Sequence, residues 1–311
     1  MADSSSGKVE IKRHSWLVDF FIRLVREKPL GTIGAVIALL FLLIAIFANF
    51  LAPYGMDEVN TVDRLLAPSA DYWLGTDHLG RDLLSRVIFG ARISATVGLA
   101  VAFFSSVIAT FMGIVSGYLG GKFDLIVQRV VDALMCFPAL LFFIAILSLT
   151  GPGLWAVILV LSLWWGITGS RVIRSATMSA RENVYVQAAV AIGCSTPRIL
   201  IRHILPNVMA AVVILATVRV AGAILIEASL SFLGFGVPPP APSWVGMLSD
   251  EARKYMFAAP WIAIWPGLAL SISVFGINMF GDAVRDLLDP RLRGSVGHYG
   301  VRVKKRSHSK K

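Results

Sequence analysis

Charged residues, cysteines and the common zinc-binding motifs are all scarce in this sequence. Only 15% of its 311 residues are charged, whereas 56% are hydrophobic; a typical soluble domain is about 25% charged. The two cysteines are Cys136, inside an apolar run, and Cys194, in a polar segment, so we expect no disulfide between them. Without a CxxC pair or a Cys/His cluster, a structural zinc site has no support. The composition indicates an integral membrane protein.

Motifs that bind nucleotides or hydrolyse substrates are also missing. The chain has no GxxxxGK[ST] sequence, and the similar segment 116–123 has Ser116 where a Walker A loop needs glycine. HExxH and GxSxG do not occur, and the five histidines are scattered. We therefore expect no catalysis by this chain and no metal or cofactor bound to it. The net charge of +10 fits a basic tail that rests near anionic lipid headgroups, and nucleic-acid binding is not needed to explain it.

Long uncharged runs dominate the rest of the sequence. The first run, 30–52, matches the roughly 20 residues that cross a bilayer and exceeds the core of a signal peptide. A later run ends at Ser170 and is too long for one helix; GPG at 151–153 divides it, and we expect its first half to start near Val130. The fold class predicted is all-α, a polytopic membrane protein with six transmembrane helices: 30–52, 93–121, the two halves of the divided run, 208–235 and 258–281.

Lysine and arginine are distributed unevenly between the loops, which predicts the orientation. The first 28 residues carry six, the tail after Gly281 carries nine, and the loop 171–206 carries five. The loop 53–90 carries three against six acidic residues, and 236–257 carries two. We therefore expect a membrane protein with both termini and the loops 122–129 and 171–206 in the cytoplasm, and with 53–90 and 236–257 outside.

This topology divides the chain into four predicted segments. A cytoplasmic N-terminal segment covers 1–28, and the first transmembrane helix with its external loop covers 29–92. The transmembrane core covers 93–281 and contains the loop 171–206, and a basic cytoplasmic tail covers 282–311. At the cytoplasmic start of the third span, we expect Arg129 to pair locally with Asp132 or Asp124. Pro138, Pro152 and Pro266 interrupt apolar helices, where they set the shape or act as hinges.

The loop between the fourth and fifth spans contains the segment YVQAAVAIGCSTPRILIRHILPN at 185–207. Small side chains at Ala188, Ala189 and Ala191, followed by Gly193, form a surface that another backbone can approach closely. Thr196 is the expected N-cap of a second short helix, with Pro197 at its first position. Arg198 and Arg202 share one face of that helix, and Pro206 is expected to end it. The segment predicts two short helices with a glycine corner, either a docking element or a plain connector.

The spacing A-A-x3-G-x11-L-P, carried by Ala188, Ala189, Gly193, Leu205 and Pro206, resembles the coupling loop of permease subunits of bacterial ATP-binding-cassette importers. Gln187 replaces the family's glutamate and His203 its isoleucine. Three other segments resemble the C-type permease of oligopeptide, dipeptide and nickel importers. These are WLGTDHLGRDLLSRVIFGARIS at 73–94, EASLSFLGFGVPPPAPSWVGML at 227–248 and GDAVRDLLDPR at 281–291.

The resemblance implies a type I importer permease (MetI-like) fold and a division of labour between subunits. It implies a heterodimer with a second permease, two ATPase subunits that bind ATP and Mg, and an extracytoplasmic substrate-binding protein. The chain would import di- or oligopeptides by ATP-driven alternating access. Its ATPase-coupling residues would be Gln187, Ala188, Ala189, Gly193, Arg198, Arg202, Leu205 and Pro206.

The segment GTDHLGRD at 75–82 precedes a helix whose apolar positions fall near one face, as in a helix lying on the membrane surface. Thr76 or Asp77 is its expected cap. The segment is either a contact for an external protein, a brace at the outer gate, or a structural elbow into the second span. The candidate external residues are Asp77, Gly80, Arg81, Asp82 and Trp244.

Arg219 and Glu227 lie in the fifth predicted span, where a charge costs roughly 2.5–3.5 kcal/mol. Such residues face protein or water, so both are candidates for lining a translocation pathway. Arg219 can instead pair with a neighbouring helix or subunit, and Glu227 can lie at the outer interface.

Two other functions stay open. The same machine could import nickel or a glutathione-like substrate, although the chain shows no metal-ligand cluster. A secondary carrier or channel without an ATPase is the other class, and it leaves the coupling-like loop unexplained.

Overall fold

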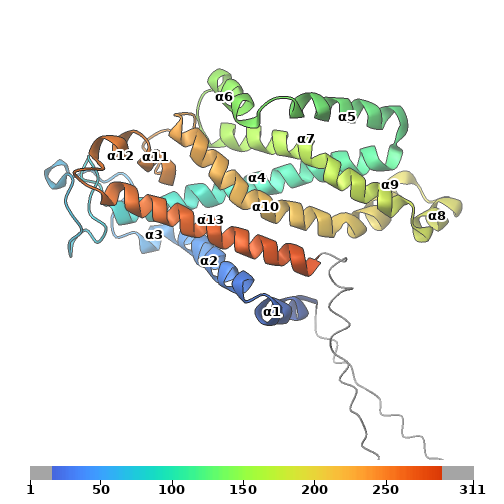
Figure 1. Ribbon diagram of the computed structural model, residues 1–311, viewed down its shortest axis with the longest axis horizontal. Coiled ribbons are helices and arrows are strands. Elements are labelled where there is room, and N and C mark those ends of the chain that lie inside the picture. Colours follow the sequence, from blue (N-terminus) through green and yellow to red (C-terminus); the bar gives the residue numbers. More distant parts are fainter. Residues whose placement is uncertain (1–15, 289–311) are drawn as a thin grey trace, which may run out of the picture.

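The computed structural model describes residues 16–288, and the basic tail falls outside the described part except for its first residues. The long helices run roughly along the longest axis of the molecule (Figure 1). The segment 52–82 lies at one end with α11 (Trp244–Leu248) and α12 (Asp250–Tyr255), whereas α8 (Val184–Ala191) and α9 (Thr196–Ile199) lie at the other. The loops thus gather at two opposite ends, as the alternation of spans predicts.

Within residues 16–288, five helices are long and apolar enough to cross a membrane. They are α2 (Pro29–Ile46), α4 (Leu83–Leu119), α7 (Leu154–Arg181), α10 (Leu205–Phe232) with the short helices before it, and α13 (Trp261–Leu288). The sixth predicted span is a pair, α5 (Gly121–Met135) and α6 (Ala139–Thr150), bent by 89°. The break falls at Pro138, because a proline disfavours helical geometry at the preceding residue. One straight helix from near Val130 was therefore wrong.

The expected surface helix at 83–88 is also wrong, because these residues form the first turns of the 37-residue helix α4. Its N-cap is Asp82, whose carboxylate accepts a hydrogen bond from the Ser85 N–H at 2.7 Å. Of the apolar positions that looked amphipathic, Leu83 is fully buried and Val87 packs against the same core, whereas Leu84 and Ile88 are half-buried. Amphipathic spacing alone does not separate lipid from protein as the apolar neighbour.

Three predicted boundaries lie inside helices. The limit at 92–93 falls within α4, α7 continues past Ser170 to Arg181, and α13 continues past Gly281 to Leu288. Charged side chains do not end these helices, since each extension packs against the rest of the chain, with Ile173, Thr177 and Leu287 buried. Two short elements, α3 (Ala48–Leu51) and η1 (Thr61–Asp63), precede the elbow at 75–82.

Small residues let the long helices approach closely. A Cβ atom at Gly113 of α4 would lie 2.7 Å from the Ile173 Cβ of α7, and one at Gly34 of α2 would lie 2.6 Å from the Gly276 carbonyl oxygen of α13. In a membrane, van der Waals packing of this kind drives helix association, because lipid tails are as apolar as the side chains and there is no hydrophobic driving force between helices. α4 therefore packs along α7, and α2 along α13.

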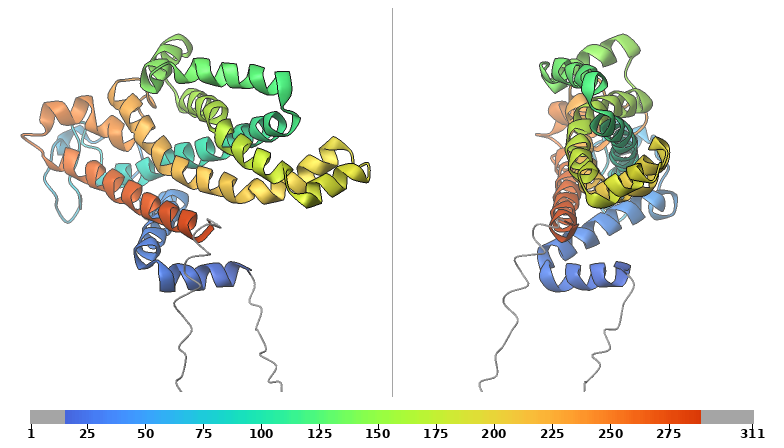
Figure 2. Two further views of the ribbon diagram at one scale, coloured as in Figure 1. Left: turned by 45° about the vertical axis from the view of Figure 1, so that its right-hand side comes forward. Right: turned by 90° about the vertical axis from the view of Figure 1, so that its right-hand side faces the viewer.

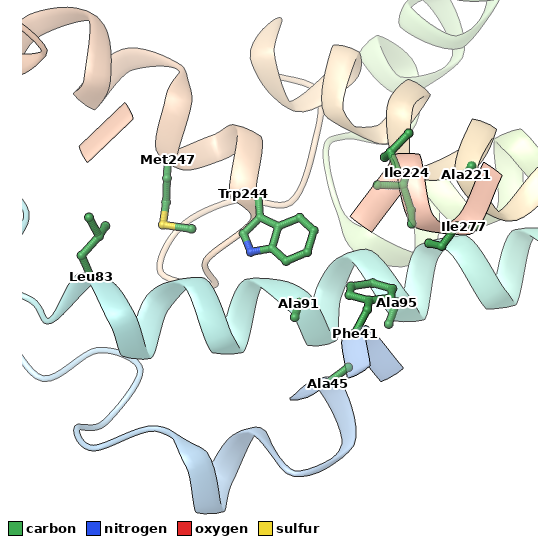
Figure 3. Packing of buried hydrophobic residues seen from close by; sticks show 11 residues of the cluster. Phe41, Ala45, Leu83, Ala91, Ala95, Ala221, Ile224, Trp244, Met247 and Ile277 are labelled. Carbon is green, nitrogen blue, oxygen red and sulfur yellow. The ribbon is translucent and has the colours of Figure 1, made fainter. Parts of the chain in front are cut away.

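One apolar core links the spans to the loop-side helices at one end of the bundle. In Figure 3, Trp244 and Met247 of α11 point toward α4, and the Trp244 ring lies near Phe41 of α2 and Ala91 and Ala95 of α4. The Phe41 and Trp244 rings are 5.6 Å apart. α11 is therefore part of the folded core and not a loose loop.

Candidate functional site

The segment 184–199 forms the two short helices that the sequence predicts, joined by a glycine corner. After α8, the Cys194 N–H donates to the Ala189 carbonyl and the Gly193 N–H to the Val190 carbonyl, each at 3.0 Å. This pair of bonds is a Schellman ending, which needs a left-handed residue. Gly193 supplies it with φ +78°. Nothing lies within 4 Å of where its Cβ would be, so the requirement at this position is conformational.

The second short helix starts and ends differently from the prediction. Its N-cap residue is Ser195, not Thr196, and the cap has no side-chain hydrogen bond. Pro206 does not end it, because α9 continues through a π-helical turn, η2 (Leu200–Ile204), directly into α10. In that wider turn, the Leu205 N–H bonds the Leu200 carbonyl. Pro206 follows in the first turn of α10, where proline is tolerated.

Burial separates the predicted coupling residues into two groups. Ala189 is buried in a cluster with Val186 and Ile199 and faces the chain's own core. The prediction that its side chain is presented to a partner was therefore wrong. The exposed residues of the predicted set are Gln187, Ala188, Gly193, Arg198, Arg202 and Pro206, and Leu205 is half-buried. The Gln187 side chain donates to the Glu182 carbonyl at 3.2 Å.

Three exposed aliphatic side chains on this loop were missed. Val184 and Ile192 are each 80% exposed, and Val190 is 53% exposed. Several exposed apolar side chains on one loop that also carries exposed arginines are typical of an interaction surface. The sequence held the signal, since small and branched apolar residues fill both faces of α8, more than its own core requires.

Ion pairs and hydrogen bonds join α7, which leads into the loop, to the neighbouring helices α4 and α5. Arg174 of α7 pairs with Asp124 of α5 through its Nε at 2.6 Å and a second guanidinium nitrogen, and Ser116 of α4 donates to the same carboxylate. Arg171 pairs with Asp132 of α5. The expected local pair of Arg129 with Asp132 is present only at 3.8 Å. The acids thus pair mainly across helices, a long-range match that spacing along the chain does not reveal.

At the opposite end, the elbow residues are buried instead of offered to a partner. The Asp77 carboxylate accepts hydrogen bonds from the backbone N–H groups of Leu79 at 2.8 Å and Arg81 at 3.0 Å. It also pairs with the Arg81 Nε at 2.6 Å and lies 3.5 Å from the Arg86 Nε. Gly80 has φ +76°, and a Cβ there would lie 1.7 Å from the Asn60 carbonyl oxygen.

Trp244 is also inside the protein, where its indole N–H donates to the Val87 carbonyl at 2.8 Å. Asp77, Arg81, Asp82 and Trp244 are all at most 5% exposed. The prediction that these side chains contact an external protein directly was therefore wrong. Their geometry is that of a structural elbow or brace, which the sequence also allows.

The two charged residues of α10 are buried within this chain. Arg219 donates to Ser105 of α4 at 3.0 Å and to the Trp165 carbonyl of α7, and it fills the space that Gly169 leaves open. It therefore ties α10 to α4 and α7. Glu227 is 1% exposed and accepts a hydrogen bond from Ser231 at 2.6 Å. Neither side chain lies on an open surface of the single chain, as a pathway-lining residue would.

An open apolar groove of about 760 Å³ lies between α4 and the continuous helix α9–α10. Phe103, Phe111, Leu200 and Met209 line it. Ser106 and Thr110, also on its wall, have hydroxyl groups with no hydrogen-bond partner among residues 16–288. No metal-binding group of three His, Cys, Asp or Glu side chains occurs in the same part of the chain.

The family follows from this architecture and from sequence comparison. Residues 109–294 match the family model of binding-protein-dependent transport system inner membrane components. Residues 15–68 match the N-terminal transmembrane domain of oligopeptide transport permease C. The chain belongs to this family: it is a multi-pass inner-membrane permease subunit of an ATP-binding-cassette importer. The resemblance read from the sequence is confirmed.

Two named permeases and one solved structure are similar to this chain. It is 38% identical over 269 residues to the dipeptide transport system permease protein DppC of Alkalihalophilus pseudofirmus, covering 86% of this chain and 88% of the relative. It is 38% identical over 275 residues to the glutathione transport system permease protein GsiD of Shigella dysenteriae, covering 88% and 90%. A chain of the inward-facing MetNI methionine transporter aligns with TM-score 0.49 and 16% identity, over 66% of this chain and 96% of that one.

Proposed function

We propose that this permease imports di- or oligopeptides as one half of a permease heterodimer driven by two ATPase subunits. The dipeptide and glutathione relatives support a peptide-like substrate. ATP and Mg would bind to the ATPases, and an extracytoplasmic binding protein would deliver the substrate. Both termini and the α8–α9 loop would lie in the cytoplasm, in keeping with the lysine and arginine distribution and with the grouping of loops at two ends.

The observation that carries this proposal is the exposed surface of the α8–α9 loop. Val184, Val190 and Ile192 are apolar and exposed on the same loop as the exposed Arg198 and Arg202, at the end of the molecule opposite segment 52–82. Burial of such side chains against an ATPase contributes roughly 25 cal/mol for each Å² of apolar area removed from water. The ATPase would hold the loop differently in its two nucleotide states, because equal binding to both states shifts no equilibrium.

The test is a mild-detergent pull-down of the tagged chain, coexpressed with its neighbouring subunits, followed by an ATPase assay of the eluate. Gly193→Trp places bulk on the corner, and Gly151→Trp is a matched control. Gly151 also has positive φ and open space around its Cβ, but it lies in the hairpin between α6 and α7. We expect Gly193→Trp to lose the ATPase and Gly151→Trp to keep it. Equal recovery by both variants would refute docking at this loop.

We place the contact with the extracytoplasmic binding protein on exposed apolar side chains of the elbow end, which is the end of the molecule that holds segment 52–82, α11 and α12. Val62, Trp73 and Phe257 are 88%, 71% and 93% exposed. They replace the buried elbow residues as candidates, since only exposed side chains can form a new interface. Trp73→Ala with Phe257→Ala should raise the concentration of binding protein needed for half-maximal ATPase stimulation at unchanged maximal activity. An unchanged half-maximal concentration would contradict this placement.

The groove between α4 and α10 is our candidate for the side that faces the second permease and the pathway. Its buried hydroxyl groups, Ser106 and Thr110, offer hydrogen bonds in an otherwise apolar wall. Cysteine pairs between Phe111→Cys and the partner permease would test this side by disulfide cross-linking.

Uptake assays with the cognate binding protein separate the substrate candidates. Competition by unlabelled dipeptide against labelled substrate supports peptide import, whereas competition by glutathione alone or by nickel alone supports an importer of that substrate. Uptake without any copurifying ATPase would support a secondary carrier or channel.

A further inference from the structure

The first helix, α1 (Trp16–Glu27), lies across the bundle and not along it. In Figure 1 it is seen almost end-on, whereas α13 runs in the plane of the picture; the left view of Figure 2 shows α1 lengthwise beneath α2 and α13. Only Lys28 separates it from α2, which is a membrane span. A helix transverse to its adjoining span lies parallel to the membrane plane.

The bend between α1 and α2 is fixed by contacts on both sides. Leu24 of α1 is buried against Ala283 and Leu287 of α13. The Thr32 hydroxyl donates to the Leu24 carbonyl at 3.0 Å, and the Lys28 ammonium pairs with Asp286. The orientation of α1 is therefore held by the fold.

A second apolar row on α1 is exposed, although the Phe21 ring meets Phe20 of the same helix edge-to-face with 5.8 Å between the ring centroids. Val18, Phe21, Ile22 and Val25 have the spacing of one helical face, and all are exposed; Phe21 and Val25 are 59% and 60% exposed. The exposed side chains Arg23 and Arg26 occupy other positions of the same helix. The combination of an apolar face with a basic polar face is typical of a helix that lies in the membrane interface.

Two observations identify the membrane, and not another protein, as the occupant of this row. The helix that follows, α2, also exposes apolar side chains, Leu30, Ile33 and Val36, in a candidate span of which only 22% is buried. The 18 residues of α2 rise about 27 Å, close to the roughly 30 Å hydrocarbon thickness. The start of α2 therefore places α1 at the level of the headgroups, where arginines meet lipid phosphates.

We propose that α1 is an interfacial anchor: its row Val18, Phe21, Ile22 and Val25 enters the acyl boundary of the leaflet on the side of the α8–α9 loop, and Arg23 and Arg26 bind anionic phospholipid headgroups. The anchor fixes the depth and tilt of α2 and of the α13 end packed against it. This role is independent of the substrate and of ATPase docking.

The test uses the full chain with Cys136→Ser and Cys194→Ser, reconstituted in liposomes and labelled with a fluorophore at one introduced cysteine. Phe21→Cys reports the apolar row and Arg23→Cys the polar face. Leu39→Cys, exposed in the middle of α2, is the lipid control, and Val62→Cys in the elbow end is the aqueous control. Thermal unfolding followed by tryptophan fluorescence verifies folding of each single-cysteine preparation.

We expect lipid chains carrying bromine to quench the Phe21→Cys label as they quench the Leu39→Cys label, and aqueous iodide to quench the Arg23→Cys label as it does Val62→Cys. Iodide quenching at Phe21→Cys would overturn the proposal. So would shielding of that label from both quenchers, because it would mean that a protein covers the row.

Headgroup binding has its own readout at the Phe21→Cys label. Brominated phosphatidylglycerol should quench it more strongly than brominated phosphatidylcholine, and Arg23→Gln with Arg26→Gln should lower this preference by up to about fivefold for each arginine. Lys122→Gln removes an exposed basic residue from α5 and should leave the preference unchanged. No preference for the anionic lipid, or equal loss with Lys122→Gln, would refute headgroup binding.

Discussion

Replacement of Asp77 should destabilise the fold instead of weakening contact with an external protein. Its carboxylate is nearly inaccessible and receives two backbone N–H groups, the Arg81 Nε at 2.6 Å and the more distant Arg86 Nε at 3.5 Å. Hydrogen bonds to a charged group contribute about 1.5–3 kcal/mol each, and removal of one partner of a buried ion pair costs about 3–5 kcal/mol. We therefore expect losses of about 2–3 kcal/mol for Asp77→Asn, which keeps one acceptor, and about 4 kcal/mol for Asp77→Ala.

The assay is thermal unfolding of the purified chain in detergent, followed by tryptophan fluorescence. For a chain of this size, 1 kcal/mol corresponds to roughly 2 °C in Tm, so Asp77→Asn should unfold about 5 °C lower and Asp77→Ala about 8 °C lower. Asp71→Asn is the matched control, because Asp71 lies in the same segment and is exposed. It should change Tm by less than about 1 °C.

The same variants distinguish the buried elbow from the binding-protein contact. If Asp77→Asn unfolds like the wild type but needs more binding protein for ATPase stimulation, the carboxylate makes an intermolecular contact and the structural argument fails. A lower Tm with unchanged half-maximal stimulation in the surviving protein supports the elbow.

Three further predictions concern the buried Arg219, the Asp124–Arg174 ion pair and the α8–α9 loop. Gly169→Val should cost about 1–3 kcal/mol by overpacking the Arg219 guanidinium, and Arg219→Met in the same chain should restore much of the Tm; no restoration would place the clash elsewhere. Asp124→Asn should lower stability by about 1–2 kcal/mol, and a double-mutant cycle with Arg174→Gln should give a coupling of similar size, whereas additive losses would deny their pairing. Gln187→Glu should keep uptake, because glutamate is the family's residue at this exposed position and only the hydrogen bond to the Glu182 carbonyl is lost; loss of uptake would show an ATPase surface that rejects the charge.

Apolar length made the spans predictable, but it could not show how they end or bend. The run 30–52 has no charge and one possible role, so α2 was recovered within a few residues. Pro138 lies in an equally apolar run, where composition does not distinguish a kink from a break of 89°. The extension of α4 was missed because the same spacing of apolar residues suits a lipid surface and a protein core.

The sequence predicted the role of a site residue where the backbone conformation requires one particular residue type. Gly193 could be assigned because a corner between two helices needs positive φ, and the structure has φ +78° there. Ala189 and Asp77 were misplaced because their exposure depends on distant partners, Ile199 for the one and Arg86 for the other. The same holds for Arg219, whose contacts with Ser105 and Trp165 are 114 and 54 residues away.

The attachment of the loop explains how a small movement of it could reach the spans. α8 follows α7 after Glu182 and Asn183, and α9 passes through the π turn at 200–204 into α10 without interruption. π turns are rare and are frequently found at functional sites. Both ends of the proposed coupling loop are thus helices that cross the membrane, and Arg219 joins them to α4 in the interior. Within 182–205, a displacement at α8 can be absorbed only at the short non-helical links 182–183 and 192–195 or at the π turn, and whatever these do not absorb tilts α7 and α10.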